Sequence, residues 1–350
     1  MKKALTTVAS FVLGTTGALA GGIERSAQSV AILFEEGRYA EFSLGYASPT
    51  VSGLFLGAVP SGDMAPAYTT LSFGYKQPLG DKVDIALIYE QPFAADVAYP
   101  TGTGYPFEGS TAELRANSVT AVLRYKLPSN ISLIGGLRAQ SIAGDVAIPF
   151  FADYTLSTST DYKLGYVVGV AWEKPEIAAR VSLTYNSEIT HDIEAVEYGA
   201  LDTKFDTTTP QSVNLEFQTG IAADTLLFGS IRWADWSVFD IISPDTGLPG
   251  VDYENDFTTY NLGVGRRFSD NWSAAITLGY EAHKGDPVGN LGPTDGFRSI
   301  AIGATYTEGK VKITGGLRYV EIGDAITRGV GSSFTDNSGW GAGLRVGYSF

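Results

Sequence analysis

Hydrophobic and polar residues alternate with a period of two along most of the chain. Between residues 340 and 350 every even position is apolar or aromatic, while every odd position is glycine, serine or a single arginine. The same alternation recurs near residues 180, 272 and 311. Because successive side chains of a β-strand point to opposite faces, each segment predicts a strand with one apolar face and one small or polar face. Strands in the wall of a membrane barrel have this pattern, with the apolar face toward lipid and the other toward the lumen.

About fourteen such segments follow one another, joined by six tight turns that alternate with seven long loops. We expect strands at 38–47, 67–78, 81–91, 116–127, 130–142, 161–173, 176–189, 211–221, 224–236, 255–268, 271–281, 297–307, 310–320 and 338–350. The long loops are expected at 48–66, 91–115, 143–160, 190–210, 237–254, 282–296 and 321–337. Short turns at one rim and long loops at the other are typical of outer-membrane barrels. The sequence therefore predicts an all-β fold, an antiparallel transmembrane β-barrel of about 14 strands.

The first twenty residues differ from the rest of the chain. Two lysines precede an apolar run that finishes with Ala18 and Ala20, as in a secretory signal peptide with a small-x-small cleavage site. A transmembrane helix is the alternative, but the run is short, contains threonine and serine, and is followed by no stop-transfer pattern. No linker tract divides the remainder. We therefore expect a signal peptide over 1–20 and a single barrel domain over 38–350.

Residues 21–37 lie between these two parts and do not alternate as a membrane strand should. Ile32, Leu33 and Phe34 are consecutive and apolar, yet charged residues stand on both sides of them. Such a segment either hangs into the periplasm or folds into the lumen as a plug. Exposing the apolar triplet to water is unfavourable, so we expect a short N-terminal plug, or hatch.

The composition argues against several classes of function. The net charge is −14 at pH 7, so nucleic acid is a poor partner. The absence of cysteine removes disulfides and thiolate metal sites. Only His191 and His283 could act as imidazole bases, and we expect both to be solvated in or beside loops, with no nucleophile motif nearby. The acidic run Asp252, Glu254 and Asp256 lacks the glycine and terminal glutamate of a calcium loop. No enzyme activity, catalytic residue, metal or cofactor is therefore expected.

Basic residues are concentrated on the predicted inner face of the strands. By the alternation rule they are Lys76, Arg124, Arg138, Lys163, Arg180, Arg232, Arg267, Lys312, Arg318 and Arg345. A guanidinium matches a carboxylate through two parallel hydrogen bonds, so we take Arg138, Arg180 and Arg318 as candidate partners of a ligand's carboxylate. The alternative is a set of ion pairs that braces the wall and docks the plug through its glutamates. Those glutamates are Glu24, Glu35 and Glu36.

A hydrophobic ligand would also need an apolar groove. We expect Ile32, Leu33 and Phe34 to contribute to it, together with aromatic residues of the long loops. These are Phe93, Tyr99, Tyr105, Phe107, Phe150 and Phe151. On loops above a barrel such side chains form either an entry site or loop-to-loop packing. If no plug closed the lumen, the inward basic residues would instead make a general or anion-selective porin.

One stretch of about 35 residues has a more specific pattern. It comprises Gly-Ile-Glu-Arg-Ser at 22–26, Ile-Leu-Phe-Glu at 32–35, Tyr39, Glu-Phe-Ser at 41–43 and Pro-Thr-Val-Ser-Gly at 49–53. This stretch resembles the outer-membrane long-chain fatty acid transporter family of the FadL/TodX type, in its alphaproteobacterial branch. Elsewhere the resemblance is limited to strand count, loop rhythm and the terminal Phe350. The Asn-Pro-Ala motif found in many hatches of this family is replaced here by residues 29–32, Ser-Val-Ala-Ile.

The resemblance implies a monomeric fourteen-stranded barrel in the outer membrane of a Gram-negative bacterium, plugged by an N-terminal hatch. Hydrophobic molecules, above all long-chain fatty acids or similar lipids, would pass from the outer loops to a lumen site and leave laterally through a kinked strand. We place that strand around 78–92. Transport would be passive, the partners would be the substrate and outer-membrane lipids, and Phe350 would be recognised by the barrel assembly machinery. An outer-membrane lipase is the least favoured alternative.

Overall fold

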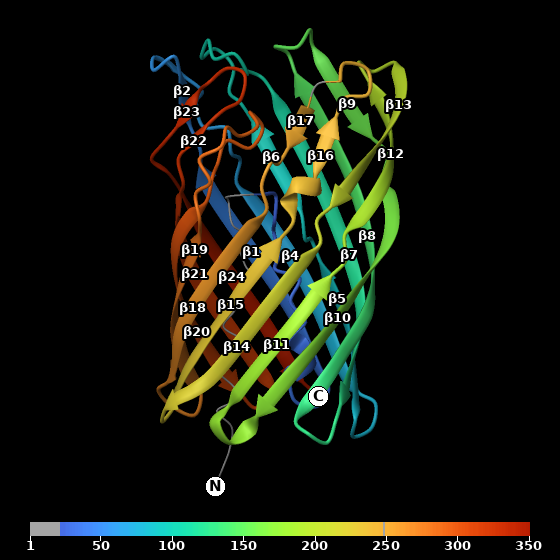
Figure 1. Cartoon of the computed structure of the whole chain (residues 1–350). Helices are drawn as coiled ribbons and strands as arrows, with labels where there is room; N and C mark the ends of the chain where they lie inside the picture. The colour runs from blue at the N-terminus through green and yellow to red at the C-terminus, as the bar shows by residue number, and fades with distance from the viewer. Residues whose placement is uncertain (1–21, 248) are drawn as a thin grey trace.

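The computed structural model describes residues 22–247 and 249–350, so the predicted signal peptide at 1–20 lies outside the described residues. Fourteen antiparallel strands of the described part form a closed barrel, in which the last strand pairs with the first. Figure 1 shows tilted strands, with the C-terminus at the end of the short turns and the long loops at the opposite end. The pairing of the first strand of the wall with the last leaves neither of them as an open sheet edge. None of the helices in the described residues is long and apolar enough to cross a bilayer.

All fourteen predicted strands are present in the predicted places. In the order of the wall they are β1 (Tyr39–Thr50), β4 (Tyr68–Pro78), β5 (Val83–Glu90), β7 (Thr111–Lys126), β8 (Ile131–Ile148), β10 (Asp161–Lys174), β11 (Ala179–Asn186), β14 (Ser212–Ala222), β15 (Thr225–Ala234), β18 (Phe257–Arg267), β19 (Trp272–Glu281), β20 (Phe297–Glu308), β21 (Val311–Ile322) and β24 (Asn337–Ser349). The prediction of an antiparallel barrel of about 14 strands is therefore confirmed.

The long loops carry further short elements. They include the strands β2 (Gly53–Phe55), β3 (Val59–Pro60), β6 (Ala94–Ala98), β9 (Tyr154–Thr158), β12 (Ile189–Glu197), β13 (Leu201–Thr209), β16 (Asp240–Ile242), β17 (Pro249–Asp252), β22 (Ala325–Ile326) and β23 (Ser333–Phe334), and the 3₁₀ helix η4 (Trp236–Val238). Two more 3₁₀ helices, η2 (Ala31–Phe34) and η3 (Pro175–Ile177), lie in the N-terminal segment and in a short turn.

Two predicted loops were wrong, because 143–160 and 190–210 are largely strand. β8 continues beyond the predicted boundary and pairs with β9, while β12 pairs with both β13 and β9. Regular pairing satisfies backbone groups that an irregular loop would have to satisfy with water or side chains. The wall therefore extends into a tall sheet on this side of the barrel.

The outward face of the wall is apolar. In β1 the outward side chains Phe42, Leu44 and Tyr46 are 44%, 45% and 49% exposed, whereas Ser43 and Ala47 face inward and are buried. Large exposed apolar side chains occur in this way around the wall. Exposing such area to water costs about 25 cal/mol per Å². The face is therefore the one that a membrane barrel turns toward lipid.

Aromatic pairs border the apolar face at both ends. The rings of Trp272 and Tyr306 lie 4.9 Å apart beside the short turns. Those of Tyr319 and Trp340 lie 4.8 Å apart nearer the long loops. Aromatic girdles at the two interfaces are typical of membrane barrels.

Three clusters of buried apolar side chains lie inside the described part of the chain, and two of them involve the N-terminal segment. The larger lies among the long loops and the adjoining strand ends and includes Phe93, Tyr105 and Trp236. The smaller joins residues of η2 to inward side chains of the wall. Ile23 packs against the larger cluster, so the N-terminal segment takes part in both.

Candidate functional site

The N-terminal segment, residues 22–37, runs lengthwise inside the barrel. Near the long loops the carbonyl of Ile23 accepts a hydrogen bond from the N–H of Ala94 at 2.9 Å. Nearer the short turns the ammonium of Lys76 donates to the carbonyl of Glu35 at 3.0 Å. The segment is therefore attached to the inner wall at both levels.

Ion pairs also attach the N-terminal segment to the wall. Arg232, which is 5% exposed, donates to Glu24 from Nη2 at 2.7 Å and from Nε at 3.1 Å. Lys312 lies 3.2 Å from Glu35. Glu36, in contrast, is exposed. Two of the three predicted docking glutamates therefore have basic partners on the wall, and such pairs are screened less by salt than surface pairs.

The helix η2 buries its apolar side chains against the wall. Leu33 is fully buried in a cluster with Val122 and other inward residues. The ring of Phe34 lies between two guanidinium groups, those of Arg124 and Arg180, each 4.4 Å from the ring centre. Each cation–π contact of this kind contributes roughly 0.5–2 kcal/mol, so the sandwich holds the segment in place.

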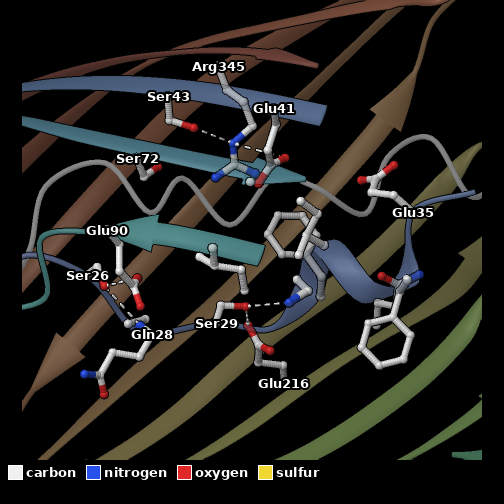
Figure 2. A pocket seen from close by; sticks show the side chains of 18 of the residues that line it. Ser26, Gln28, Ser29, Glu35, Glu41, Ser43, Ser72, Glu90, Glu216 and Arg345 are labelled. Carbon is white, nitrogen blue, oxygen red and sulfur yellow. Dashed lines mark hydrogen bonds and ion pairs between the residues drawn. The ribbon is translucent and has the colours of Figure 1, made fainter. Parts of the chain in front are cut away.

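A pocket of about 200 Å³, lined by both charged and apolar side chains, opens beside the N-terminal segment, and we call it the lower pocket. Figure 2 shows how two serines of the segment meet glutamates of the wall across it. Ser26 donates to Glu90 at 2.5 Å, and Ser29 donates to Glu216 at 2.7 Å. The lining also includes Arg180. The lower pocket therefore presents carboxylate oxygens and a guanidinium group to any molecule that enters it.

Three of the six predicted ligand residues line the lower pocket, namely Ile32, Phe34 and Arg180. Arg180 lies against the ring of Phe34. Within the described part of the chain, its guanidinium makes no hydrogen bond and lies within ion-pair distance of no carboxylate. Its N–H donors therefore remain available to a ligand in the pocket.

The other three predicted ligand residues do not line this pocket. Leu33 packs into the wall. Arg138 is 3% exposed and donates to Thr120 and Asn186, both at 3.0 Å. Arg318 donates to Ser299 at 2.9 Å and lies 5.2 Å from the ring of Phe297. Alternation predicted that these two arginines face inward, but it could not tell which inward arginine is already engaged by the wall.

A second pocket, the upper pocket, lies near the long loops. It has a volume of about 60 Å³ and is lined mainly by apolar side chains, including Ile23, Leu114, Ile142, Leu156 and Phe239. Its lining contains no lysine or arginine among the described residues. A cavity of this size has room for a few waters, but its mainly apolar lining offers them few partners, and apolar cavities bind apolar ligands.

The sequence contained a signal for the upper pocket that the alternation pattern alone did not reveal. Inward positions in the middle of β7 are polar, as at Ser118 and Thr120, but those near its long-loop end are Ala112 and Leu114. Inward residues that change from polar to apolar along a strand indicate an apolar chamber above a polar one.

The predicted loop aromatics do not line either of the two pockets described above. Phe93, Tyr99, Tyr105 and Phe107 are buried, and the rings of Tyr99 and Tyr105 stack at 5.3 Å. Phe150 and Phe151 extend this group of contacting rings. Of the two alternatives, loop-to-loop packing is therefore the one that the structure shows.

The wall has a gap beside the lower pocket. β4 pairs with β5 only over residues 73–78, and β6 pairs with β7 rather than with β4. β5 ends at Glu90, and the break that follows contains Pro92, which has no N–H for a ladder bond. Across the gap, the N–H of Leu71 donates to the side-chain oxygen of Gln91 at 3.0 Å. The lower pocket is lined by Leu71 and Phe73 on the β4 side, so it reaches this gap.

The prediction that His191 is solvated was wrong. His191 lies on β12, outside the barrel wall strands, where it is fully buried and its Nδ1 lies 2.9 Å from Asp161. Burial lowers the pKa of His191, which favours the neutral ring. The neighbouring Asp192 instead pairs with Lys163. His283 is exposed, as expected, and lies 2.8 Å from Asp295.

The predicted acidic loop is neutralised by an arginine. Arg328 pairs with Asp252 and lies 2.9 Å from Glu254. In the described residues there is no group of three or more histidine, cysteine, aspartate or glutamate side chains placed to hold a metal ion. The acidic residues of this loop therefore serve to connect it to the neighbouring loop.

Comparison with known proteins gives structural likeness without close sequence likeness. No protein-family model matches the chain, and no curated protein matches it. A solved FadL homologue from Pseudomonas aeruginosa is 15% identical and has a TM-score of 0.74, with 96% of each chain covered. The toluene transporter TodX of P. putida is 12% identical with a TM-score of 0.66, covering 95% of this chain and 94% of its own. The monoaromatic hydrocarbon channel CymD is 14% identical with a TM-score of 0.62, covering 97% and 99%.

These likenesses extend over nearly the whole chain, whereas the sequence resemblance was sharp only near its start. The structural likeness rests on the closed antiparallel barrel and the order of its strands. The chain therefore has the fold of the FadL- and TodX-type channels, as the resemblance in residues 22–53 predicts.

Proposed function

We propose that this protein is a passive channel for the uptake of hydrophobic molecules across the outer membrane of a Gram-negative bacterium. The observation that carries the proposal is the apolar upper pocket beneath the long loops, whose described lining holds no lysine or arginine, in contrast to the charged lining of the lower pocket. An apolar molecule gains free energy by moving from water into such a pocket. Two proteins with the same fold are the toluene transporter TodX and the monoaromatic hydrocarbon channel CymD.

In this proposal residues 1–20 are a cleaved signal peptide, residues 21–37 are the hatch and residues 38–350 are the barrel. The substrate binds in the upper pocket and moves along the N-terminal segment to the lower pocket. Ile23 lines the first and Arg25 the second, so one stretch of chain connects the two. The substrate leaves through the gap between β4 and β5. A monomer folded by the barrel assembly machinery suffices for this route.

The proposal is tested by filling the upper pocket. Ala112 lines it, and a phenylalanine there would occupy its volume. A ligand that buries about 60 Å² less apolar area loses roughly 1.5 kcal/mol, or about tenfold in affinity. Uptake of a radiolabelled long-chain alcohol into Gram-negative cells is therefore expected to fall about tenfold in A112F.

The matched control is A139F, because Ala139 is exposed on the outward face of the same sheet. Its uptake should equal that of the wild type. Equal uptake by A112F and the wild type, with both proteins present in the membrane at the same level, would refute the upper pocket as the entry site.

The finer part of the proposal is that the substrates are long-chain fatty acids or similar lipids. Arg180 supports it, because its donors face the lower pocket and could bind a carboxylate through two hydrogen bonds. R180Q is expected to lower uptake of a long-chain fatty acid about tenfold while leaving the alcohol of the same length unchanged, since a charge-assisted bond contributes roughly 1.5–3 kcal/mol.

Two results of the Arg180 experiment have distinct meanings. Equal loss for acid and alcohol would assign Arg180 to holding Phe34 rather than to the ligand. No loss for either would leave uncharged hydrophobic molecules as the substrates. R138Q is not a suitable control, because Arg138 is bonded within the wall. The wild type measured with each ligand therefore serves as the reference.

The alternative function, an anion-selective porin, is less well supported by the lining. The lower pocket presents six glutamates and three arginines, and several inward basic residues are paired with acids of their own. Anion selectivity needs a ring of basic side chains that is not neutralised in this way.

A further inference from the structure

The outward wall has a shallow groove near the short turns. It has a volume of about 810 Å³ and crosses β19, β20 and β21. Its floor is formed by Ala274, Ala304 and Gly315, which lie side by side because Ala274 pairs with Ala304 and Ala304 with Gly315. On β1 and β4 the outward positions carry large side chains such as Phe42 and Phe73 instead. The groove is therefore a local feature of one side of the barrel.

Two rows of larger side chains border the groove. Above it, away from the short turns, stand Ile276, Ile302 and Leu317, which are 46%, 55% and 54% exposed. Below it stands the aromatic pair of Trp272 and Tyr306. Because aromatic pairs of this kind mark the level of lipid head groups, the groove lies just inside the apolar layer.

A basic side chain stands at one end of the groove. Arg266 pairs through its backbone with Ala274 and is exposed on the outward face. Among the described residues its guanidinium has no hydrogen-bond or ion-pair partner. Placing a charged arginine side chain in the apolar layer on the lipid face of a barrel costs free energy. That cost falls at the membrane interface, where the guanidinium can pair with an anion.

We infer that this groove binds one phospholipid of the leaflet on the short-turn side, with an acyl chain along the Ala274–Ala304–Gly315 floor and the phosphate at Arg266. Charge complementarity supports a lipid over a second copy of the chain. The described lining of the groove contains no aspartate or glutamate, so a second copy docked through the same face would offer Arg266 no anion from this surface, whereas a phosphate accepts bidentate hydrogen bonds from one guanidinium. The inference is independent of the transported substrate.

Native mass spectrometry of the full-length mature protein with phosphatidylglycerol tests the inference. R266Q removes the cation, and A304F places a large ring on the floor of the groove. Each is expected to weaken binding of the tightest lipid about tenfold, as loss of one charge-assisted contact or of one buried chain segment predicts. The matched control is R298Q, because Arg298 is also exposed and outward but lies at the opposite end of β20.

The outcomes separate the possible occupants. Lipid adducts that are the same for the wild type, R266Q and A304F would overturn the inference. A dimer that A304F dissociates would also overturn it, in favour of a second copy of the chain. Displacement of the adduct by inorganic phosphate alone would show that only a free anion is bound. The gel mobility shift of the folded barrel on heating confirms that each variant is folded.

Discussion

Deleting residues 22–37 is expected to convert a barrel that carries no steady ion current into one that conducts. In the intact protein the N-terminal segment passes along the lumen and is attached by the Glu24–Arg232 pair and the buried Leu33. Removing it leaves space beside inward faces that are polar in the middle of the wall, as at Ser118 and Thr120, and ions can enter a water-filled lumen of this kind. Single-protein recordings in planar bilayers measure the change directly.

A milder variant shows whether the segment acts as a hatch. F34A keeps the chain length but removes the ring held between Arg124 and Arg180. Since two cation–π contacts contribute roughly 1–4 kcal/mol together, brief openings are expected at least about fivefold more often than in the wild type. Steady current through the intact protein would refute closure and favour a porin. A deletion variant that is folded but silent would show that something other than this segment closes the lumen.

Blocking the gap between β4 and β5 is expected to abolish most of the uptake while leaving ligand binding intact. Ser72 lies on the part of β4 that has no β5 partner, and it lines the lower pocket. A tryptophan in S72W would fill the passage from the pocket toward the lipid. Uptake of a radiolabelled substrate into cells measures transport, and equilibrium binding to the purified protein measures occupancy of the upper pocket.

The control for S72W is T69W, because Thr69 is exposed on the same strand but points outward. T69W should transport like the wild type. If S72W also transported normally, the substrate would have to leave toward the short turns rather than through the wall. If both binding and uptake were lost in S72W, the two pockets would be a single site.

The barrel itself could be predicted from the sequence alone. A period of two, six tight turns and seven long connections determine the strands, because a membrane barrel must alternate lipid-facing and lumen-facing side chains. The same pattern placed Arg180 on the inner face and Ile32 and Phe34 in the segment before the barrel. These are local properties, and each is visible within a few residues of chain.

The parts that the sequence did not predict depend on contacts between distant segments. Whether an inward arginine is free or engaged depends on its cross-strand neighbours. Arg138 bonds to Asn186, 48 residues away, whereas Arg180 lies against the ring of Phe34 and has no hydrogen-bond partner among the described residues. His191 is buried because β12 is extended by pairing with β9 and β13, which no local pattern indicated. The upper pocket arises where several strands end in apolar inward residues at one height.

The sequence by itself therefore determined the barrel, its orientation of faces and the presence of an apolar segment before the first strand. Only the tertiary structure decided which inward charges neutralise one another, where hydrogen bonds between neighbouring wall strands are missing and where the two pockets lie. The physical reason is that alternation is set by the geometry of a single strand, whereas pockets, gaps and ion pairs are set by the register among strands and by what fills the space between them.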